Sequence, residues 1–341
     1  MALTDRRFQT PDIPGRKHGD ARAKQNRQRR GFPDALPQLP IRLVQVPLFA
    51  REGAKVVVND AGGAPDGAGS DATPAQMVVD EILQLGGEAV ANTDSVSSWE
   101  GSERLIQTAV DRFGRLDVLV NNAGILRDRM LVNLDESDWD AVLDVHLKGT
   151  FCTTRHAAAY WRERAKSTGA TDASVICTSS NSGLQNNVGQ ANYGAAKAGI
   201  AAFAQIAAKE LSRYGVRVNT IGPVARTRLT LQTPGLDKIV GTPDDPNAFD
   251  VFDPANIAPL VAYLATSTCP YTGGVWAVWG GEVGLYEGWK VVHKTSKGAR
   301  WEVEELAVEV PIMLDGRAGS AEVLLSEGQN PTELMSDAFS G

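Results

Sequence analysis

The chain has 341 residues and a mass of 36.4 kDa, which is long for one average domain, although α/β chains of about 250 to 300 residues often fold as a single unit. Apolar residues make up 43% of it, charged residues 22% and aromatic residues 6%, which excludes a collagen, a coiled coil and a wholly disordered chain. The net charge is −7, and the longest apolar runs, such as residues 200–203, are too short to span a bilayer, so no transmembrane helix is expected.

The first 47 residues differ from the rest of the chain in charge. They carry ten Lys and Arg against four Asp and Glu, whereas the remaining residues carry 24 against 37. Because prolines are scattered among these basic residues, the segment is expected to be disordered. Asp5, Asp12 and Asp20 argue against a mitochondrial transit peptide. A nucleic-acid-binding arm predicts steeply salt-dependent DNA affinity, but the acidic remainder of the chain favours no nucleic acid partner.

The cysteines and histidines indicate neither a disulfide framework nor a metal site. Cys152, Cys177 and Cys269 are odd in number and widely spaced, which is typical of packed thiols in a reducing compartment, so a cytoplasmic location is expected. The four histidines show no spacing that suits metal ligands.

From residue 54 onward, strands and helices alternate, which predicts a parallel sheet with crossover helices. The predicted strands are 55–60, 88–92, 116–120, 174–179, 216–221 and, as the last one, 275–278; the predicted helices are 73–85, 99–113, 138–161, 191–214 and 254–265. We therefore expect a Rossmann-like, doubly wound α/β domain over residues 48–289. Residues 290–341 form a tail of unknown role, with short elements possible at 301–310 and 321–325.

The sharpest chemical pattern is Tyr193 followed four residues later by Lys197. On a helix this spacing puts both side chains on one face, so the ammonium can lower the pKa of the phenol and make it a general base near neutral pH. Ser180 lies at the carboxyl end of the predicted strand 174–179, thirteen residues before Tyr193. An isolated Tyr-x-x-x-Lys is common by chance and usually marks an exposed helix face, so its context decides what it means.

That context is supplied by Asn121-Asn-Ala-Gly124 after one predicted strand and Asn219-Thr-Ile-Gly-Pro223 at the end of another. With these motifs in this order, residues 48–289 resemble the short-chain dehydrogenases/reductases. Residues 57–60, 123–129, 146–149 and 189–193 are similar to the (3R)-hydroxyacyl-CoA dehydrogenase unit of peroxisomal multifunctional β-oxidation enzymes and their bacterial relatives, and residues 257–264 match as well.

The resemblance implies a role for each catalytic position. Tyr193 would take the hydroxyl proton as hydride leaves for a nicotinamide, Ser180 would hold the substrate oxygen, and Lys197 would bind the ribose and keep the tyrosine acidic. The family's fourth position, usually an asparagine that holds a proton-relay water, falls on His146. A histidine could hold the same water through one ring nitrogen, although a lone helix histidine is more often structural.

The same resemblance implies NAD as the cofactor. Asp60 ends a strand of the nucleotide half, where an acid accepts from the ribose hydroxyls and would repel the 2′-phosphate of NADP, although it could also be a solvated turn residue. Asp94 resembles the family's adenine-contacting aspartate. The other positions expected at the cofactor are Asn121, Ala123, Gly124 and Pro223.

The family's first strand and its glycine-rich turn are not found before residue 48, so they are absent or replaced. Residues 41–46 cannot serve as that strand, because the eight residues that follow are too few for a parallel crossover of about a dozen. The glycines at 62–69 follow the second strand and make a poor phosphate cradle. We interpret residues 1 to about 47 as a frameshifted or wrongly joined reading of the gene, and we expect the sheet to lack its central strand.

The expected reaction is NAD-dependent oxidation of a 3-hydroxyacyl-CoA, with a hydroxysteroid or a 3-oxoacyl-carrier-protein as alternative substrates. As in the family, a homodimer or homotetramer is expected, with helices 99–113, 138–161 or 191–214 at its interfaces. The alternative from another class is a catalytically impaired remnant that acts as a binding or partner subunit.

Overall fold

The computed structural model describes residues 2–4, 48–63, 73–227, 230–232, 240–243, 245, 247–291 and 293–314. Contacts divide the chain into two units, Met1–Tyr286 and Glu287–Gly341. The first unit thus ends at Tyr286, three residues before residue 289, where the sequence suggests that the dehydrogenase-like domain ends. The possible element at 321–325, the segment at 41–46 and most of the basic first segment lie outside the described residues.

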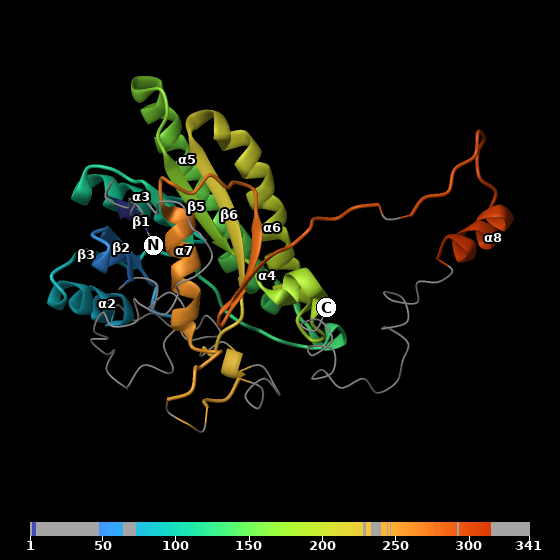
Figure 1. The fold of residues 1–341 in the computed structure, drawn as a ribbon, viewed down its shortest axis with the longest axis horizontal. Helices are drawn as coiled ribbons and strands as arrows, with labels where there is room; N and C mark the ends of the chain where they lie inside the picture. Colours follow the sequence, from blue (N-terminus) through green and yellow to red (C-terminus); the bar gives the residue numbers. More distant parts are fainter. Residues whose placement is uncertain are drawn as a thin grey trace, which may run out of the picture. The chain divides into compact units, whose positions relative to one another are not determined.

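The first unit is built on a single sheet in the order β3-β2-β1-β4-β5-β6-β7-β8 (Figure 1). The parallel strands are β2 (Lys55–Asn59), β3 (Glu88–Asn92), β4 (Val118–Asn121), β5 (Ala173–Thr178), β6 (Val216–Pro223) and β7 (Val275–Trp279). Each lies within two residues of its predicted bounds. The alternation of strands and helices therefore predicted the parallel sheet correctly.

The central position of the sheet is filled, which corrects the expectation that this strand is missing. β1 (Ala2–Thr4) pairs with β2 on one side and with β4 on the other, antiparallel to both. Thr4 lies opposite Lys55, at the start of β2, so the carboxyl end of β1 points to the edge opposite that at which the parallel strands end. A three-residue strand satisfies the backbone groups of both neighbours in either direction, and the sequence pattern does not reveal that direction.

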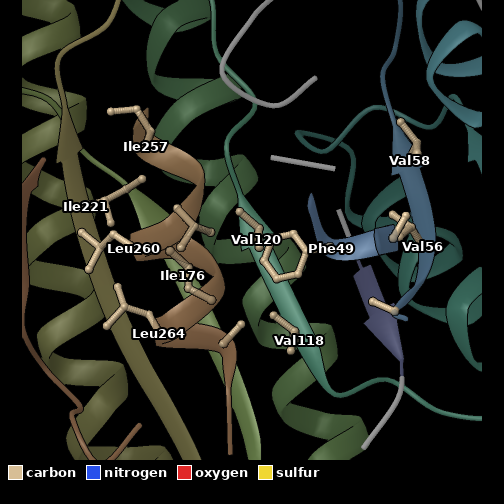
Figure 2. Close-up of a cluster of buried hydrophobic side chains, with 14 of the residues drawn as sticks. Phe49, Val56, Val58, Val118, Val120, Ile176, Ile221, Ile257, Leu260 and Leu264 are labelled. Atoms are coloured by element: carbon tan, nitrogen blue, oxygen red, sulfur yellow. The ribbon is translucent and has the colours of Figure 1, made fainter. Parts of the chain in front are cut away.

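Helices cover both faces of the sheet. α2 (Thr73–Gln84) and α7 (Ala258–Ala265) lie on one face, and α3 (Trp99–Phe113), α5 (Gly149–Thr168) and α6 (Ala191–Leu211) on the other. Val56 and Val58 enter the first core while Val57 enters the second, as the two-residue period of a strand requires. Figure 2 shows the first core, in which the α7 residue Leu260 packs over the central strands.

The predicted helix 138–161 is interrupted. α4 (Glu136–Leu143) passes through a π-helical turn, η2 (Asp144–Lys148), into α5. The extra residue in this turn brings His146 inward, where the residue is 2% exposed. Such turns are frequent at functional sites, and apolar periodicity does not predict them.

The prediction that residues 275–278 form the last strand is wrong, because a further strand follows β7. β8 (Glu282–Leu285) pairs antiparallel with β7, and Trp279 lies opposite Glu282 across a two-residue turn of Gly280 and Gly281. Gly280 has a φ of +48°, which the left-handed conformation of such a hairpin turn requires and glycine tolerates. The glycine pair was therefore an available hairpin signal.

Short turns complete the first unit: η1 (Leu131–Asn133), the π-turn η3 (Ser182–Asn186), η4 (Ser212–Tyr214), η5 (Thr230–Gln232) and η7 (Pro254–Ile257). The second unit contains α8 (Val303–Leu314), which includes the predicted element at 301–310 only in part. Within the described residues, every helix is too short or too polar to cross a membrane.

Candidate functional site

The predicted catalytic residues gather at the edge where β4, β5 and β6 end. Ser180 follows β5 by two residues, and α6 begins at Ala191, so Tyr193 and Lys197 lie in its first two turns. Ligands of open α/β sheets bind outside this edge. The structure therefore brings together residues that are 17 positions apart in the sequence.

Ser180, Tyr193 and Lys197 lie close together. The Ser180 side chain is near enough to Tyr193 to lower the pKa of its phenol, and Lys197 Nζ lies 5.5 Å from the centroid of the Tyr193 ring. Lys197 is 4% exposed and donates to the carbonyl oxygen of Thr178 at 2.7 Å. A buried ammonium with one backbone acceptor, placed over the phenol, is a group whose charge is easily lost.

Burial dominates the proton affinities of this cluster. It raises the pKa of Tyr193 to about 12, partly offset by the hydrogen bond from Ser180 and increased further by the charge of Asp128. Burial lowers the pKa of Lys197 to about 7. The expectation that the ammonium lowers the pKa of the phenol is thus not met in this structure, because both groups are removed from water and each disfavours its charged form.

The lowered pKa of Lys197 predicts a pH-dependent stability. An unfolded lysine binds its proton up to a higher pH than the folded one, so between pH 7 and 9 the unfolded state holds more protons and the free energy of unfolding rises with pH. Urea unfolding at pH 7, 8 and 9 should show this slope in the unmodified protein and a smaller one in Lys197→Met. Lys209→Met, at an exposed position of the same helix, should keep the slope; equal slopes in all three would contradict the prediction.

His146 lies against Tyr193, but its ring is held by the backbone. Its ring meets that of Tyr193 edge-on with centroids 5.1 Å apart, and its Nε2 lies 3.1 Å from the Ile125 nitrogen and 2.8 Å from the Ile125 oxygen. Nδ1 is buried without a hydrogen-bond partner among the described residues. Burial lowers the pKa of His146 to about 3, so the ring is neutral at physiological pH.

The Asn-Asn-Ala-Gly segment braces this arrangement. Asn121 Nδ2 donates to Thr154 Oγ1 at 2.9 Å, and its Oδ1 accepts from Thr153 Oγ1 at 2.8 Å, which ties β4 to α5. A Cβ on Gly124 would lie 2.3 Å from Cε1 of His146, so only glycine fits beside that ring. Ala123 lies between these two positions, and Pro223 ends β6 on the same sheet edge.

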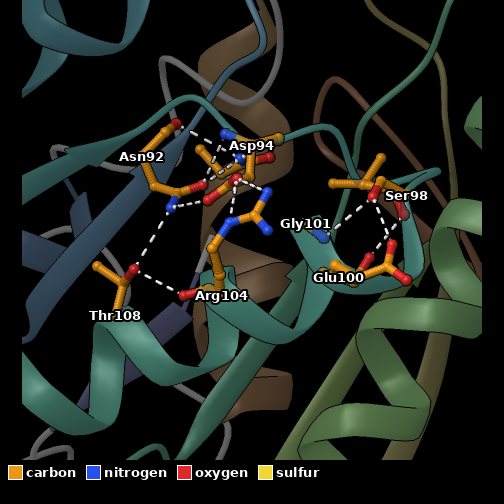
Figure 3. A network of polar contacts seen from close by, with 10 residues as sticks. Asn92, Asp94, Ser98, Glu100, Gly101, Arg104 and Thr108 are labelled. Atoms are coloured by element: carbon orange, nitrogen blue, oxygen red, sulfur yellow. Dashed lines mark hydrogen bonds and ion pairs between the residues drawn. The ribbon is translucent and has the colours of Figure 1, made fainter.

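Two carboxylates lie where the adenosine end of a dinucleotide is expected. Asp60 directly follows β2, is 6% exposed and accepts from the Gly62 nitrogen at 2.9 Å. Asp94 follows β3 and lies in a polar network in which Arg104 Nε donates to its Oδ1 at 2.8 Å and Asn92 Nδ2 to its Oδ2 at 2.9 Å (Figure 3). Both acids are thus oriented at the sheet edge that also holds Ser180.

These residues fit the two ends of a nicotinamide dinucleotide but not its middle. An acid at the end of β2 suits ribose hydroxyls, and Lys197 beside Tyr193 suits the second ribose. The pyrophosphate normally lies on a glycine turn between the central strand and a helix N-terminus. Since β1 is antiparallel, its carboxyl end is at the opposite edge, and the described residues form no such turn.

Sequence reasoning did not assign roles to Asp128, Ser182 and Gln190, whose side chains are joined by two hydrogen bonds of 2.7 Å. It also overlooked Arg226, which is 6% exposed and pairs with Asp250 and the carbonyl oxygen of Gly241. Gln190 and Asp128 belong to quoted motifs, but single residues within a motif do not disclose their contacts. No group of three or more metal-ligating side chains occurs among the described residues.

Comparison with known proteins agrees with this geometry. The family model described as short chain dehydrogenase matches residues 46–232, more than half of the chain. The chain belongs to the short chain dehydrogenase family. It is an oxidoreductase of that family, and the matched residues include β2 to β6, the Asn-Asn-Ala-Gly segment and the Tyr193 helix.

Individual members of the short chain dehydrogenase family cover different shares of the chain. A short chain dehydrogenase from Mycobacterium avium superposes with a TM-score of 0.71 at 48% identity, over 80% of this chain and 90% of that one. A hydroxyacyl-CoA dehydrogenase of Mycobacterium tuberculosis is 41% identical over 79% of this chain and 83% of its own. Peroxisomal multifunctional enzyme type 2 of Drosophila melanogaster is 46% identical over 66% of this chain. The matched residues span 35% of the length of that protein.

Proposed function

We propose that this dehydrogenase oxidises a (3R)-hydroxyacyl-CoA to the 3-oxoacyl-CoA, with NAD as the cofactor and Ser180, Tyr193 and Lys197 as the catalytic residues. The observation that carries the proposal is the position of these three side chains where β5 ends and α6 begins, with Lys197 Nζ 5.5 Å from the centroid of the Tyr193 ring. NAD, when bound, supplies the hydride acceptor. The protein supplies orientation and proton transfer.

Each catalytic side chain has a task that its surroundings support. Ser180 has a single hydroxyl hydrogen, which it turns to the substrate oxygen when substrate is bound. The Tyr193 phenolate takes the hydroxyl proton at its Oη and becomes the phenol, and Lys197, when protonated, stabilises the phenolate before the transfer. His146 is neutral and acts by position, with Nδ1 as the ring nitrogen able to hold a water. Because the pKa of Tyr193 is raised to about 12, the phenol is protonated at neutral pH, and oxidation should accelerate as pH rises.

NAD is preferred over NADP in this proposal because of Asp60. A buried carboxylate at the end of β2 accepts from ribose hydroxyls and repels a 2′-phosphate. Asp60→Ser should therefore raise the KM for NAD and lower that for NADP, whereas Asp80→Ser, an exposed acid on α2, should change neither.

The acyl-CoA substrate is proposed from the relatives. One is named a hydroxyacyl-CoA dehydrogenase, and others are named peroxisomal multifunctional enzymes. The purified chain is assayed with NAD and (3R)- and (3S)-hydroxyacyl-CoA esters of increasing chain length, with a hydroxysteroid and a 3-hydroxyacyl-carrier-protein in parallel, by NADH absorbance. Turnover of the (3R)-thioesters alone is expected, and preference for the steroid or the carrier protein would overturn the substrate assignment.

A second candidate, an impaired enzyme that acts as a partner subunit, is favoured by the antiparallel β1 and by the lack of a pyrophosphate turn among the described residues. It predicts no binding of NADH or NADPH. Both candidates include a homodimer or homotetramer, for which the half-exposed Trp99 on α3 and Phe151 on α5 offer apolar contact area. Light scattering would give the subunit number. A cytoplasmic location also belongs to the proposal, and the three cysteines are free thiols.

A further inference from the structure

A line of hydrogen bonds runs from Asp128 to Ser180 through side chains that the proposed mechanism does not use. Gln190 Nε2 donates to Asp128 Oδ2 at 2.7 Å, and Ser182 Oγ donates to Gln190 Oε1 at 2.7 Å. Ser180 Oγ donates to Ser182 Oγ at 3.3 Å, and it accepts from the Ser182 backbone nitrogen at 3.2 Å. The line therefore ends on a catalytic hydroxyl.

The middle of this line is buried and joins three segments of the chain. Ser182 is 6% exposed and Gln190 5% exposed, so an unmade hydrogen bond at either would be unfavourable. Asp128 lies in the loop after β4, Ser182 begins the π-turn η3, and Gln190 directly precedes α6. A backbone bond from the Arg129 nitrogen to the Gly189 oxygen, at 3.0 Å, ties the outer two segments together.

The carboxylate gives the line a direction. An ionised Asp128 accepts only, so the Gln190 nitrogen must face it and the Gln190 oxygen must face Ser182. The Ser182 hydroxyl hydrogen is then directed to Gln190, and its oxygen also accepts from Asn187 Nδ2 at 3.0 Å. Ser182 Oγ consequently never donates to Ser180, whose own hydrogen can turn to Tyr193 or to the substrate oxygen.

The geometry points to Gln190 as a positioning residue that holds Ser180 and Tyr193 at a fixed separation, by bonding Asp128 with its amide nitrogen and Ser182 with its amide oxygen. Since Gln190 directly precedes the helix of Tyr193 and Ser182 is two residues from Ser180, its side chain links both catalytic groups. The inference deepens the proposed function and rests on it for its kinetic consequence, whereas the link itself can be tested without turnover.

The first test is spectroscopic and uses the full chain labelled with ¹³Cζ-tyrosine, with the Tyr193 signal assigned from Tyr193→Phe. Ser180→Ala removes the hydrogen bond to Tyr193 and should move this signal. Gln190→Met keeps the length of the side chain but removes both amide bonds, and it should move the signal in the same direction. Gln107→Met breaks a bond of equal length, 2.7 Å to Asp111, on the exposed face of α3 and should leave the signal in place.

The conservative variant Gln190→Glu adds a pH signature. Near pH 5 the introduced carboxylic acid can still donate to Asp128 and accept from Ser182, whereas at pH 8 two carboxylates face each other and the bond is lost. Arg127 and Arg129 on the same loop both pair with Asp138. The Tyr193 signal of Gln190→Glu should therefore match that of the unmodified protein at low pH and that of Gln190→Met at high pH.

The second test is kinetic. Gln190→Met should lower kcat by about tenfold to a hundredfold, the effect of a small misplacement, with the KM values nearly unchanged. If Ser180→Ala moves the Tyr193 signal and Gln190→Met does not, the positioning role is overturned. If the unmodified protein turns over no substrate, the proposed function fails, while the Tyr193 signals still decide whether Gln190 holds the two groups.

Discussion

Tyr193→Phe is expected to lower kcat by about 10² to 10⁴ while the protein stays folded and keeps its affinity for NADH. The substitution removes only the hydroxyl that receives the substrate proton, and proton transfer by a positioned side chain is worth that range in rate. The ring that meets His146 edge-on remains, so the packing of the π-turn is preserved. Steady-state kinetics and a fluorescence titration with NADH measure the two effects separately.

Tyr263→Phe is the matched control for this prediction. It removes the same hydroxyl from a tyrosine of α7 that is 38% exposed and outside the site, so its kcat should equal that of the unmodified protein. A Tyr193→Phe protein with more than a tenth of the normal kcat would show that the proton goes elsewhere. Equal losses in both variants would mean that the assay reports stability instead of catalysis.

Gly183→Ala is expected to destabilise the protein and to reduce its activity together. A Cβ at this position would lie 2.5 Å from the Ala198 nitrogen and 2.7 Å from the Lys197 carbonyl carbon, which are backbone atoms of α6. Because a helix backbone cannot step aside as a side chain can, η3 must move away from α6 and carry Ser180 with it. Forced overpacking of this kind usually costs about 1–3 kcal/mol.

The measurement is urea unfolding and kcat of the same preparation, with Gly288→Ala as the control. A Cβ on Gly288 would meet nothing within 4 Å, so that variant should match the unmodified protein in both properties. Unchanged stability and kcat in Gly183→Ala would contradict the close packing of η3 against α6.

The repeating pattern of the chain was enough to predict the fold, because buried parallel strands and crossover helices leave strong periodic signals. β2, β3 and α3 lie at their predicted positions for this reason. The π-turn of His146 and the antiparallel direction of β1 could not be predicted, since they depend on contacts made only in the folded chain. A histidine bonded to a backbone loop 21 residues earlier leaves no periodic trace.

The sequence predicted which side chains lie close together at the candidate site, but it did not predict their pKa values. Motif spacing placed Ser180, Tyr193 and Lys197 together, but the sign of the pKa change at Tyr193 depends on how far water is excluded, which spacing does not state. The same limit applies to Asp128 and Gln190. Asp128 and Gln190 are 62 residues apart in the sequence, and their hydrogen bond forms only when the loop after β4 has folded against the residue that precedes α6.

The most direct test of NAD-dependent oxidation is a thermal-shift titration of the purified chain with NADH and NADPH. A ligand present at about 100 times its dissociation constant stabilises a fold by about 2.7 kcal/mol, which is readily seen as a higher Tm. Asp60, Asp94 and Lys197 at one sheet edge predict a rise in Tm with NADH at lower concentrations than with NADPH. No rise with either nucleotide would contradict the account and favour the impaired partner subunit, in agreement with the antiparallel direction of β1.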